Sequence, residues 1–411
     1  MGSITKTDVA VLGGGASGLS AAIAAKRADS SLGVVVAERL DKTGRKILAT
    51  GNGRCNLTNR GLCAEKYRGT VANFMQIIES TDNTEDFFRS LGVVCTADSE
   101  GRVYPYSRTA ASVLSALRLE LERLGIAEKC GFFAEKIEKT GGGFRVYSQS
   151  GEIIECRGLI AACGGYAAPV YGTDGSAARM FRDMGFSVSR ICPSVAPLRV
   201  KPEQLKGLKG VRARGRVTAL CGGRALRTEE GEIQFTENAL SGICVFNLAY
   251  LFSQYEGNFA LQADLVPDLS RRETADLVAE LREKRSDAPP EELLTGVFAK
   301  NLAAYLVKRA ISRPIARCAE LKQGEIQAVA SLIKAMEFTV TGCSPWQNAQ
   351  VTSGGINGSC VDSTLQSRRY KGLYLAGELL DIDGDCGGYN LEWAWSSGAW
   401  AGRNCALSLK K

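Results

Sequence analysis

A glycine-rich turn near the N-terminus has the residue types and spacing of a phosphate-binding loop. Gly13, Gly15 and Gly18 follow an apolar run over residues 8–12 and precede a small-residue pattern that predicts a helix over residues 19–27. The first glycine permits the tight turn, the second lets a pyrophosphate approach the backbone amides, and the third lets helix and sheet pack closely. Glu38 ends the next apolar strand 20 positions after Gly18 and can bind a ribose hydroxyl. These residues predict a dinucleotide site.

A second group of polar residues lies in a loop over residues 43–59, which has no hydrophobic periodicity. Its cationic and amide side chains are Arg45, Lys46, Arg54, Asn52, Asn56 and Asn59. Such donors suit a bound pyrophosphate or the electron-rich edge of a flavin. An ordinary surface loop can have the same composition, so this segment alone leaves both interpretations open.

The C-terminal segment favours a flavin over a nicotinamide as the bound group. An apolar strand at residues 372–376 ends in Gly377 and Glu378, which could hold a ribityl chain. A glycine-rich turn over residues 381–390 then leads into a predicted helix that ends near residue 405. The positive end of this helix, pointed at a flavin, would stabilise negative charge on the reduced ring. The alternative is a terminal helix that serves only packing.

The chain contains no histidine, so a proton for any reduction must come from another group. The candidates in the turn before the last helix are Tyr389, Cys386 and Asp381. Tyr389 is preferred, because a phenol beside a helix N-terminus can donate a proton and bind a substrate oxygen. The alternative is that Tyr389 only packs beside the cofactor.

Composition excludes several other classes of protein. The 14 cysteines form no CxxC pair, and histidine is absent, so we expect no metal site. No apolar stretch is long enough to cross a membrane, and no export signal is evident, which predicts a cytoplasmic protein with reduced thiols. The net charge of +7 is modest for a nucleic-acid binder, so nucleic acid is not the expected partner. The oligomeric state is left open.

Element patterns predict an α/β protein with a Rossmann-type nucleotide-binding domain interrupted by two inserts. Residues 1–190 and 341–411 are expected to form the nucleotide-binding domain. Residues 191–267 read as a β-rich, barrel-like insert, and residues 268–340 as a small helical insert.

Four blocks of the sequence resemble the HI0933-like or BaiN-like family of NAD(P)/FAD-dependent oxidoreductases, also described as the aminoacetone oxidase family. They are the N-terminal glycine motif and the segments 44–59, 349–355 and 377–398, joined by similar blocks at 101–107 and 235–242. The resemblance implies FAD contacts at Gly13, Gly15, Ala16, Ser17, Gly18, Glu38, Arg39, Lys46, Asn52, Gly53, Arg54, Cys55, Asn56, Phe133, Cys163, Gly164, Gly377, Glu378, Gly388, Tyr389, Asn390 and Leu391.

The resemblance also implies an activity. The expected function is hydride transfer between NAD(P)H and a small organic substrate, which could be an enone, through non-covalently bound FAD. One alternative is a flavin-dependent oxidase that uses oxygen. The other is a flavin-containing protein that binds or modifies RNA through the basic stretch at residues 201–227, although that stretch lacks the interleaved aromatic residues that stack on bases.

Overall fold

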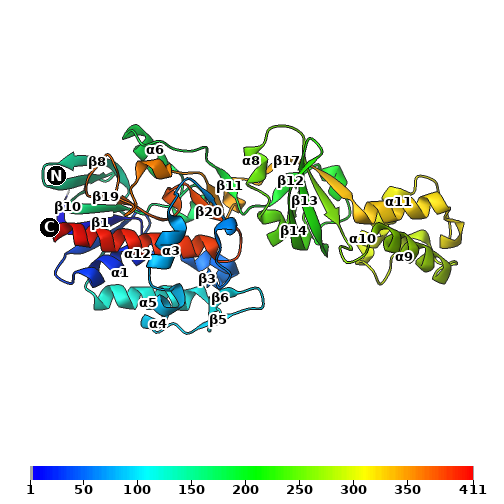
Figure 1. Cartoon of the computed structure of the whole chain (residues 1–411), viewed down its shortest axis with the longest axis horizontal. Helices are drawn as coiled ribbons and strands as arrows, with labels where there is room; N and C mark the ends of the chain where they lie inside the picture. Colours follow the sequence, from blue (N-terminus) through cyan, green and yellow to red (C-terminus); the bar gives the residue numbers. More distant parts are fainter. Residues whose placement is uncertain (1–2, 411) are drawn as a thin grey trace. The chain divides into compact units, whose positions relative to one another are not determined.

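The computed structural model describes residues 3–410, which divide into two compact units (Figure 1). The first unit combines the chain up to residue 192 with the chain from residue 350 onward, and the second is residues 193–349. No helix within residues 3–410 is long and apolar enough to cross a membrane.

A mainly parallel sheet forms the centre of the first unit. Its parallel strands lie in the order β7-β2-β1-β10, and β19 adds to the far side of β10. A hairpin of β9 and β8 pairs antiparallel with the first half of β10. The strands are β1 (Ile4–Leu12), β2 (Val34–Glu38), β7 (Ala127–Cys130), β8 (Ala134–Thr140), β9 (Gly143–Ser148), β10 (Ile153–Ala161) and β19 (Leu373–Leu375).

Both faces of the sheet are buried along β2, β19 and the second halves of β1 and β10, where the strands are continuous apolar runs. Alternate residues of β1 enter different cores. Val9 and Val11 pack on the side of the long helices, whereas Ala10 and Leu12 pack in a second cluster on the opposite face. The long helices are α1 (Ala16–Ala28), α5 (Ala110–Arg123) and α12 (Tyr389–Leu409). α1 and α12 lie side by side (Figure 1).

Glycines on α12 allow this close approach. A Cβ on Gly398 would lie 2.2 Å from the Ser17 carbonyl oxygen, and one on Gly402 would lie 2.1 Å from that of Ala21. The Ser20 hydroxyl also donates to the Trp395 carbonyl at 2.5 Å. The C-terminal helix is therefore fixed against the helix that follows the glycine motif.

Smaller elements of the first unit surround the sheet. β3 (Thr58–Asn59), β6 (Arg102–Pro105) and β5 (Cys95–Ala97) form a three-stranded sheet, and β4 (Tyr67–Gly69) pairs with β20 (Ile382–Gly384). The remaining elements are α2 (Arg45–Ala49), α3 (Phe74–Ser80), α4 (Thr84–Ser90), α6 (Ser176–Asp183), β18 (Val351–Ser353) and β11 (Cys192–Ser194), whose last two residues belong to the second unit.

The second unit contains a closed antiparallel barrel in the order β12-β15-β14-β13-β16-β17. Its strands are β12 (Leu198–Val200), β13 (Arg212–Cys221), β14 (Arg224–Phe235), β15 (Ala239–Ser241), β16 (Phe259–Asp264) and β17 (Met336–Cys343). The helices α7 (Ile243–Phe246) and α8 (Leu251–Gln254) follow β15. The helices α9 (Arg271–Lys284), α10 (Lys300–Ala310) and α11 (Gln323–Lys334) come between β16 and β17.

The expected α/β fold with a barrel insert is confirmed, but the boundaries of the inserts differ from the sequence prediction. Residues 336–340 were assigned to the helical insert, and residues 341–349 to the nucleotide-binding domain. In the structure β17 pairs with both β16 and β12, so it closes the barrel. The chain therefore leaves the second unit only after this strand, at residue 349.

Candidate active site

The predicted cofactor-binding residues gather at one edge of the parallel sheet. β1, β2, β10 and β19 run in the same direction, so the segments that follow them emerge together. These segments begin with Gly13, Arg39, Ala162 and Ala376. The carboxyl edge of a parallel sheet is where ligands bind in folds of this type.

The three motif glycines have distinct roles. Gly13 has φ +101°, and a Cβ there would lie 2.4 Å from the Ala162 carbonyl oxygen. A Cβ on Gly18 would lie 1.8 Å from the Gly13 carbonyl oxygen, so that position requires glycine for packing. A Cβ on Gly15 would meet no atom within 4 Å. Gly15 therefore borders open space at the N-terminus of α1, which no side chain caps.

Glu38 holds the backbone around this space. Its carboxylate accepts hydrogen bonds from the Gly14 amide at 2.7 Å and the Leu40 amide at 2.9 Å. The residue is 9% exposed, so only a small part of its surface can contact a ligand. A carboxylate in this position can also accept a ribose hydroxyl.

We expect Glu38→Ala to weaken FAD binding by about 1–3 kcal/mol, because a charged acceptor of ribose and backbone hydrogen bonds is lost. The measurement is the FAD dissociation constant of the protein after removal of its flavin. Asp8→Ala is a matched control, since Asp8 accepts the Gly33 amide at the opposite end of the same strands. A dissociation constant that is equal in wild type and Glu38→Ala would contradict the ribose assignment.

Arg39 and Phe133 lie together beside Glu38. The Arg39 guanidinium is 4.3 Å from the centre of the Phe133 ring and pairs with Asp174 at 2.9 Å. The Phe132 amide donates to the Glu38 carbonyl at 2.9 Å, which connects the two segments. The expectation that the Phe133 backbone flanks an adenine stays a prediction.

The loop after α2 has an unusual backbone. Gly51, Asn52, Gly53 and Cys55 all have φ between +54° and +80°. Left-handed conformations in residues other than glycine are strained, and such strain is often found at ligand-binding sites. The loop containing the predicted contacts Asn52, Gly53, Arg54, Cys55 and Asn56 is thus held in one defined shape.

Lys46 connects this region to the segment after β19. Its ammonium lies 2.7 Å from Glu378 Oε2, and Glu378 Oε1 accepts the Thr352 amide at 2.8 Å. Gly377 packs on the glycine motif, since a Cβ on it would lie 2.4 Å from Ser17 Oγ. Segments more than 300 residues apart in sequence therefore form one side of the site.

The N-terminus of α12 approaches the loop from the other direction. A Cβ on Gly388 would lie 2.4 Å from the Thr58 carbonyl oxygen and 3.0 Å from Asn56 Oδ1. The Asn390 side chain donates to the Gly384 carbonyl and accepts the Gly384 amide, both at 2.8 Å, which fixes the turn before the helix. The predicted contacts Gly388, Tyr389, Asn390 and Leu391 thus begin a helix whose positive end borders this loop.

Two buried oxygens in the same place lack partners. Within residues 3–410, Asn56 Oδ1 and Thr58 Oγ1 are sealed from solvent and make no hydrogen bond. Unsatisfied buried polar atoms are costly and often mark a ligand site. Together with the open space at Gly15 and the two helix N-termini, they fit a dinucleotide with a polar ring system at its far end, as FAD has.

The three predicted catalytic residues have different surroundings. Asp381 accepts hydrogen bonds from Ser189 Oγ at 2.6 Å and Thr70 Oγ1 at 2.9 Å, which is a structural clamp. The Tyr389 hydroxyl is 3.4 Å from the Gly61 carbonyl oxygen, and burial raises the pKa of this phenol. A catalytic role for each remains a prediction.

The cysteines near the site are protonated thiols at neutral pH. Burial raises the pKa of Cys55 and Cys163 to about 12 and that of Cys386 to about 11. A thiolate is the reactive form of cysteine, so these environments do not favour nucleophilic chemistry. No group of three or more metal-ligating side chains occurs within residues 3–410 that could hold a metal ion.

Sequence reasoning missed two features. One is a buried ion pair in which Arg68 contacts Asp383 at 2.8 Å and Asp385 at 2.6 Å, just before the turn to α12. The other is Tyr104, which lies beside the strained loop in the block at residues 101–107. The resemblance had marked that block but gave no role to any of its residues.

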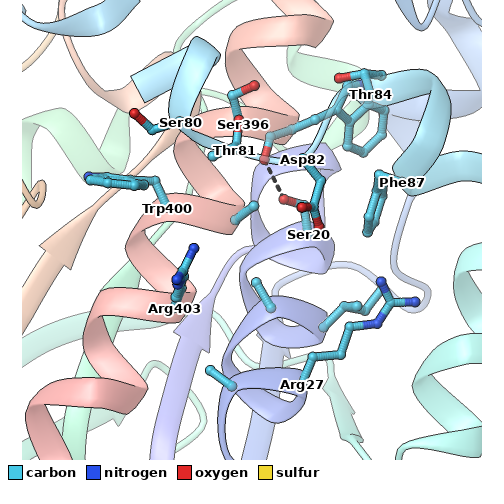
Figure 2. Close-up of a pocket in the computed structure, with 15 residues that line it drawn as sticks. Ser20, Arg27, Ser80, Thr81, Asp82, Thr84, Phe87, Ser396, Trp400 and Arg403 are labelled. Carbon is cyan, nitrogen blue, oxygen red and sulfur yellow. Dashed lines mark hydrogen bonds between the residues drawn. The ribbon is translucent and has the colours of Figure 1, made fainter. Parts of the chain in front are cut away.

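A separate pocket of about 250 Å³ lies between α1, α12 and the loop after α3 (Figure 2). Trp400 and Arg403 line one side, and Phe87 and Arg27 line another. None of the predicted cofactor contacts lines this pocket. It is therefore distinct from the candidate active site.

The sequence matches the HI0933-like Rossmann-domain family over residues 7–404. The chain belongs to this family. A 3-dehydro-bile acid delta(4,6)-reductase from Clostridium scindens is 37% identical over 405 residues, covering 97% of this chain and 98% of the relative. Ribosomal RNA dihydrouridine synthases from Haemophilus influenzae and Escherichia coli are 27% and 28% identical, each covering 98% of both chains.

The fold of this HI0933-like protein also occurs in solved structures. The FrdA chain of E. coli quinol fumarate reductase aligns with a TM-score of 0.51 at 15% identity, over 100% of this chain and 71% of the other. The likeness places the parallel sheet and its inserted unit in the FAD-binding fold. The HI0933-like protein is thus a flavoprotein of the oxidoreductase class by family and fold.

Proposed function

We propose that this protein is an FAD-dependent reductase that takes a hydride from NAD(P)H and adds it to a carbon–carbon double bond conjugated to a carbonyl group. The observation that carries the proposal is a pair of helix N-termini at the candidate site: the uncapped start of α1, beside open space at Gly15, and the start of α12, beside the unpaired oxygens of Asn56 and Thr58. This arrangement suits a flavin dinucleotide bound without a covalent link.

The named relatives support the choice of double bond. A delta(4,6)-reductase of 3-dehydro-bile acids acts, by its name, on double bonds conjugated to the 3-oxo group. A dihydrouridine synthase saturates a uracil double bond that is conjugated to a ring carbonyl. Both reactions are the same addition of a hydride and a proton, although the molecules that carry the double bond differ.

Individual residues of the chain would serve defined roles in this function. The backbone after Gly15 would bind the pyrophosphate, and Glu38 the adenosine ribose. Glu378, held by Lys46 and the Thr352 amide, would orient the ribityl chain. The α12 N-terminus would stabilise negative charge at the ring. FAD, when bound, supplies the hydride chemistry that no side chain of the protein can provide.

A small-molecule substrate is favoured over RNA. The bile acid reductase is 37% identical, against 27–28% for the ribosomal RNA enzymes. On the barrel, Arg212 and Arg214 pair with Glu232 and Glu230 of the neighbouring strand, both at 3.2 Å. These pairs reduce the positive charge that a phosphate backbone would need. Reduction of RNA remains the second candidate because two full-length relatives carry that activity in their names.

The proposal predicts a specific sequence of spectral changes. The purified protein should be yellow and release free FAD on acid denaturation. Anaerobic NADH or NADPH should bleach the bound flavin, and a 3-oxo-4,6-diene bile acid should restore its colour faster than oxygen does. Uridine-containing ribosomal RNA serves as the alternative acceptor. Reoxidation by oxygen alone would show an oxidase, and a colourless native protein would overturn the proposal.

A further inference from the structure

The block at residues 101–107 contains a buried phenol between the two segments expected to hold the flavin. The Leu57 amide donates to the Val103 carbonyl at 2.8 Å, which fixes β6 against the strained loop. The Asn59 side chain donates to the Gly387 carbonyl at 2.9 Å and lies 3.4 Å from the Glu100 carbonyl oxygen. These bonds connect β6 to the turn before α12.

Tyr104, on β6, is only 4% exposed, and its ring lies against the strained loop. A Cβ on Gly51 would be 3.6 Å from the Tyr104 ring. The hydroxyl makes no hydrogen bond to any residue in the described chain, yet it is not among the oxygens sealed from solvent. Buried phenols normally find a partner, so this hydroxyl is available to a ligand.

Two cations lie over the same ring. The guanidinium of Arg54 is 5.3 Å from the ring centre, and that of Arg108 is 4.8 Å from it. No ion pair joins Arg54 or Arg108 to an acidic side chain within residues 3–410. Arg108 keeps φ at +53°, a conformation that costs free energy in a residue other than glycine. Positive charge is thus concentrated beside the free phenol without an anion to neutralise it.

We propose that Tyr104 is the proton donor of the reduction and that Arg54 and Arg108 stabilise the oxyanion formed on the substrate. The inference rests on the proposed function. When a hydride adds to the β-carbon of the conjugated system, the double-bond electron pair moves to the carbonyl oxygen. When the electron pair moves back from this oxygen, the α-carbon takes a proton from the Tyr104 hydroxyl. Solvent then reprotonates the phenolate of Tyr104. The substrate gains one hydride and one proton.

Tyr104 suits this step better than Tyr389 does. The Tyr389 hydroxyl has the Gly61 carbonyl as a partner at 3.4 Å, and its ring packs edge-on against Tyr67. Burial raises the pKa of Tyr104, while the charges of Arg102 and Arg54 oppose the rise. The phenol is therefore in its donor form at neutral pH, as a general acid must be before transfer.

The test compares Tyr104→Phe with wild type and with Tyr106→Phe in the FAD-loaded protein. Tyr106 lies two residues along the same block and is 73% exposed, so it is a matched control. With a 3-oxo-4,6-diene bile acid as acceptor, Tyr104→Phe should slow substrate reduction by roughly 100-fold while leaving flavin reduction by NAD(P)H unchanged. Tyr106→Phe should match wild type in both steps.

A second measurement does not depend on turnover. p-Nitrophenolate mimics the oxyanion, and its binding to the oxidised protein can be followed by its own absorbance. Arg54→Met and Arg108→Met should each bind it about tenfold more weakly than wild type does, because a charged partner of the oxyanion is lost. Tyr104→Phe should bind it as wild type does, since the proposal places the Tyr104 proton at the α-carbon.

Equal rates of substrate reduction in wild type and Tyr104→Phe would overturn the assignment of Tyr104, and equal p-nitrophenolate affinities in wild type and both arginine variants would overturn that of Arg54 and Arg108. A slowing by Tyr389→Phe that equals or exceeds the slowing by Tyr104→Phe would also overturn the assignment of Tyr104. A wild-type protein that binds FAD and is reduced, but reduces neither the bile acid nor RNA, would instead overturn the proposed function. The two failures are therefore distinguishable.

Discussion

Gly15→Ala is expected to leave the protein folded while weakening its FAD binding at least tenfold. Gly15 has φ −83°, which any residue adopts, and an added Cβ meets no protein atom within 4 Å. Alanine is a poorer helix N-cap than glycine, at a cost of about 1 kcal/mol, which a domain of ordinary stability survives. The methyl group would instead occupy the space that the pyrophosphate needs against the first amides of α1. Thermal denaturation without flavin and the FAD dissociation constant measure the two effects separately.

Gly18→Ala is the matched comparison within the same motif. Its Cβ would lie 1.8 Å from the Gly13 carbonyl oxygen and 3.4 Å from Val11 Cγ1, so α1 must shift away from the sheet. Overpacking of this kind costs about 1–3 kcal/mol or more of stability. Gly18→Ala should therefore destabilise the protein even without flavin. An FAD dissociation constant that is equal in wild type and Gly15→Ala would show that the open space at Gly15 is not a ligand site.

The residues that the sequence assigned to the cofactor are those with strong local signals. The glycines at 13 and 18, the strand-ending Glu38, and the glycine-opened helix at Gly388 each act through backbone geometry that spacing alone reveals. The structure brings these segments together at one sheet edge. Their contact with FAD itself stays a prediction.

Other features depend on contacts between distant segments, and local patterns cannot reveal them. Gly158 lies within β10, and a Cβ there would be 2.5 Å from Cys405 Sγ on α12, so this position requires a glycine for a contact between segments nearly 250 residues apart. The strand β17 closes a barrel whose other strands precede it by more than 70 residues. Tyr104 is connected to the turn before α12 through Asn59, which pairs with Arg102 of β6 and donates to the Gly387 carbonyl.

The sequence also does not reveal the ion pair of Arg68 with Asp383 and Asp385. This pair lies just before the turn that leads into α12. Both carboxylates are 2% exposed or less, and Arg68 bonds to Asp383 through two nitrogens, at 2.8 and 3.0 Å. Burial opposes the charge of Arg68, but the two carboxylates outweigh it and raise the pKa of the guanidinium. β4 and β20 are thereby held together just before Gly387 and Gly388.

Arg68→Met is therefore expected to destabilise the first unit by about 3–5 kcal/mol, because it leaves two buried carboxylates without their guanidinium. The thermal midpoint should fall by on the order of 10 °C. Arg68→Lys keeps the charge but not the paired geometry and should lose less. Arg145→Met, which removes a half-exposed pair with Glu155 at 2.7 Å, is the control and should cost at most about 1 kcal/mol. Equal midpoints for Arg68→Met and Arg145→Met would show that the buried pair does not hold the turn.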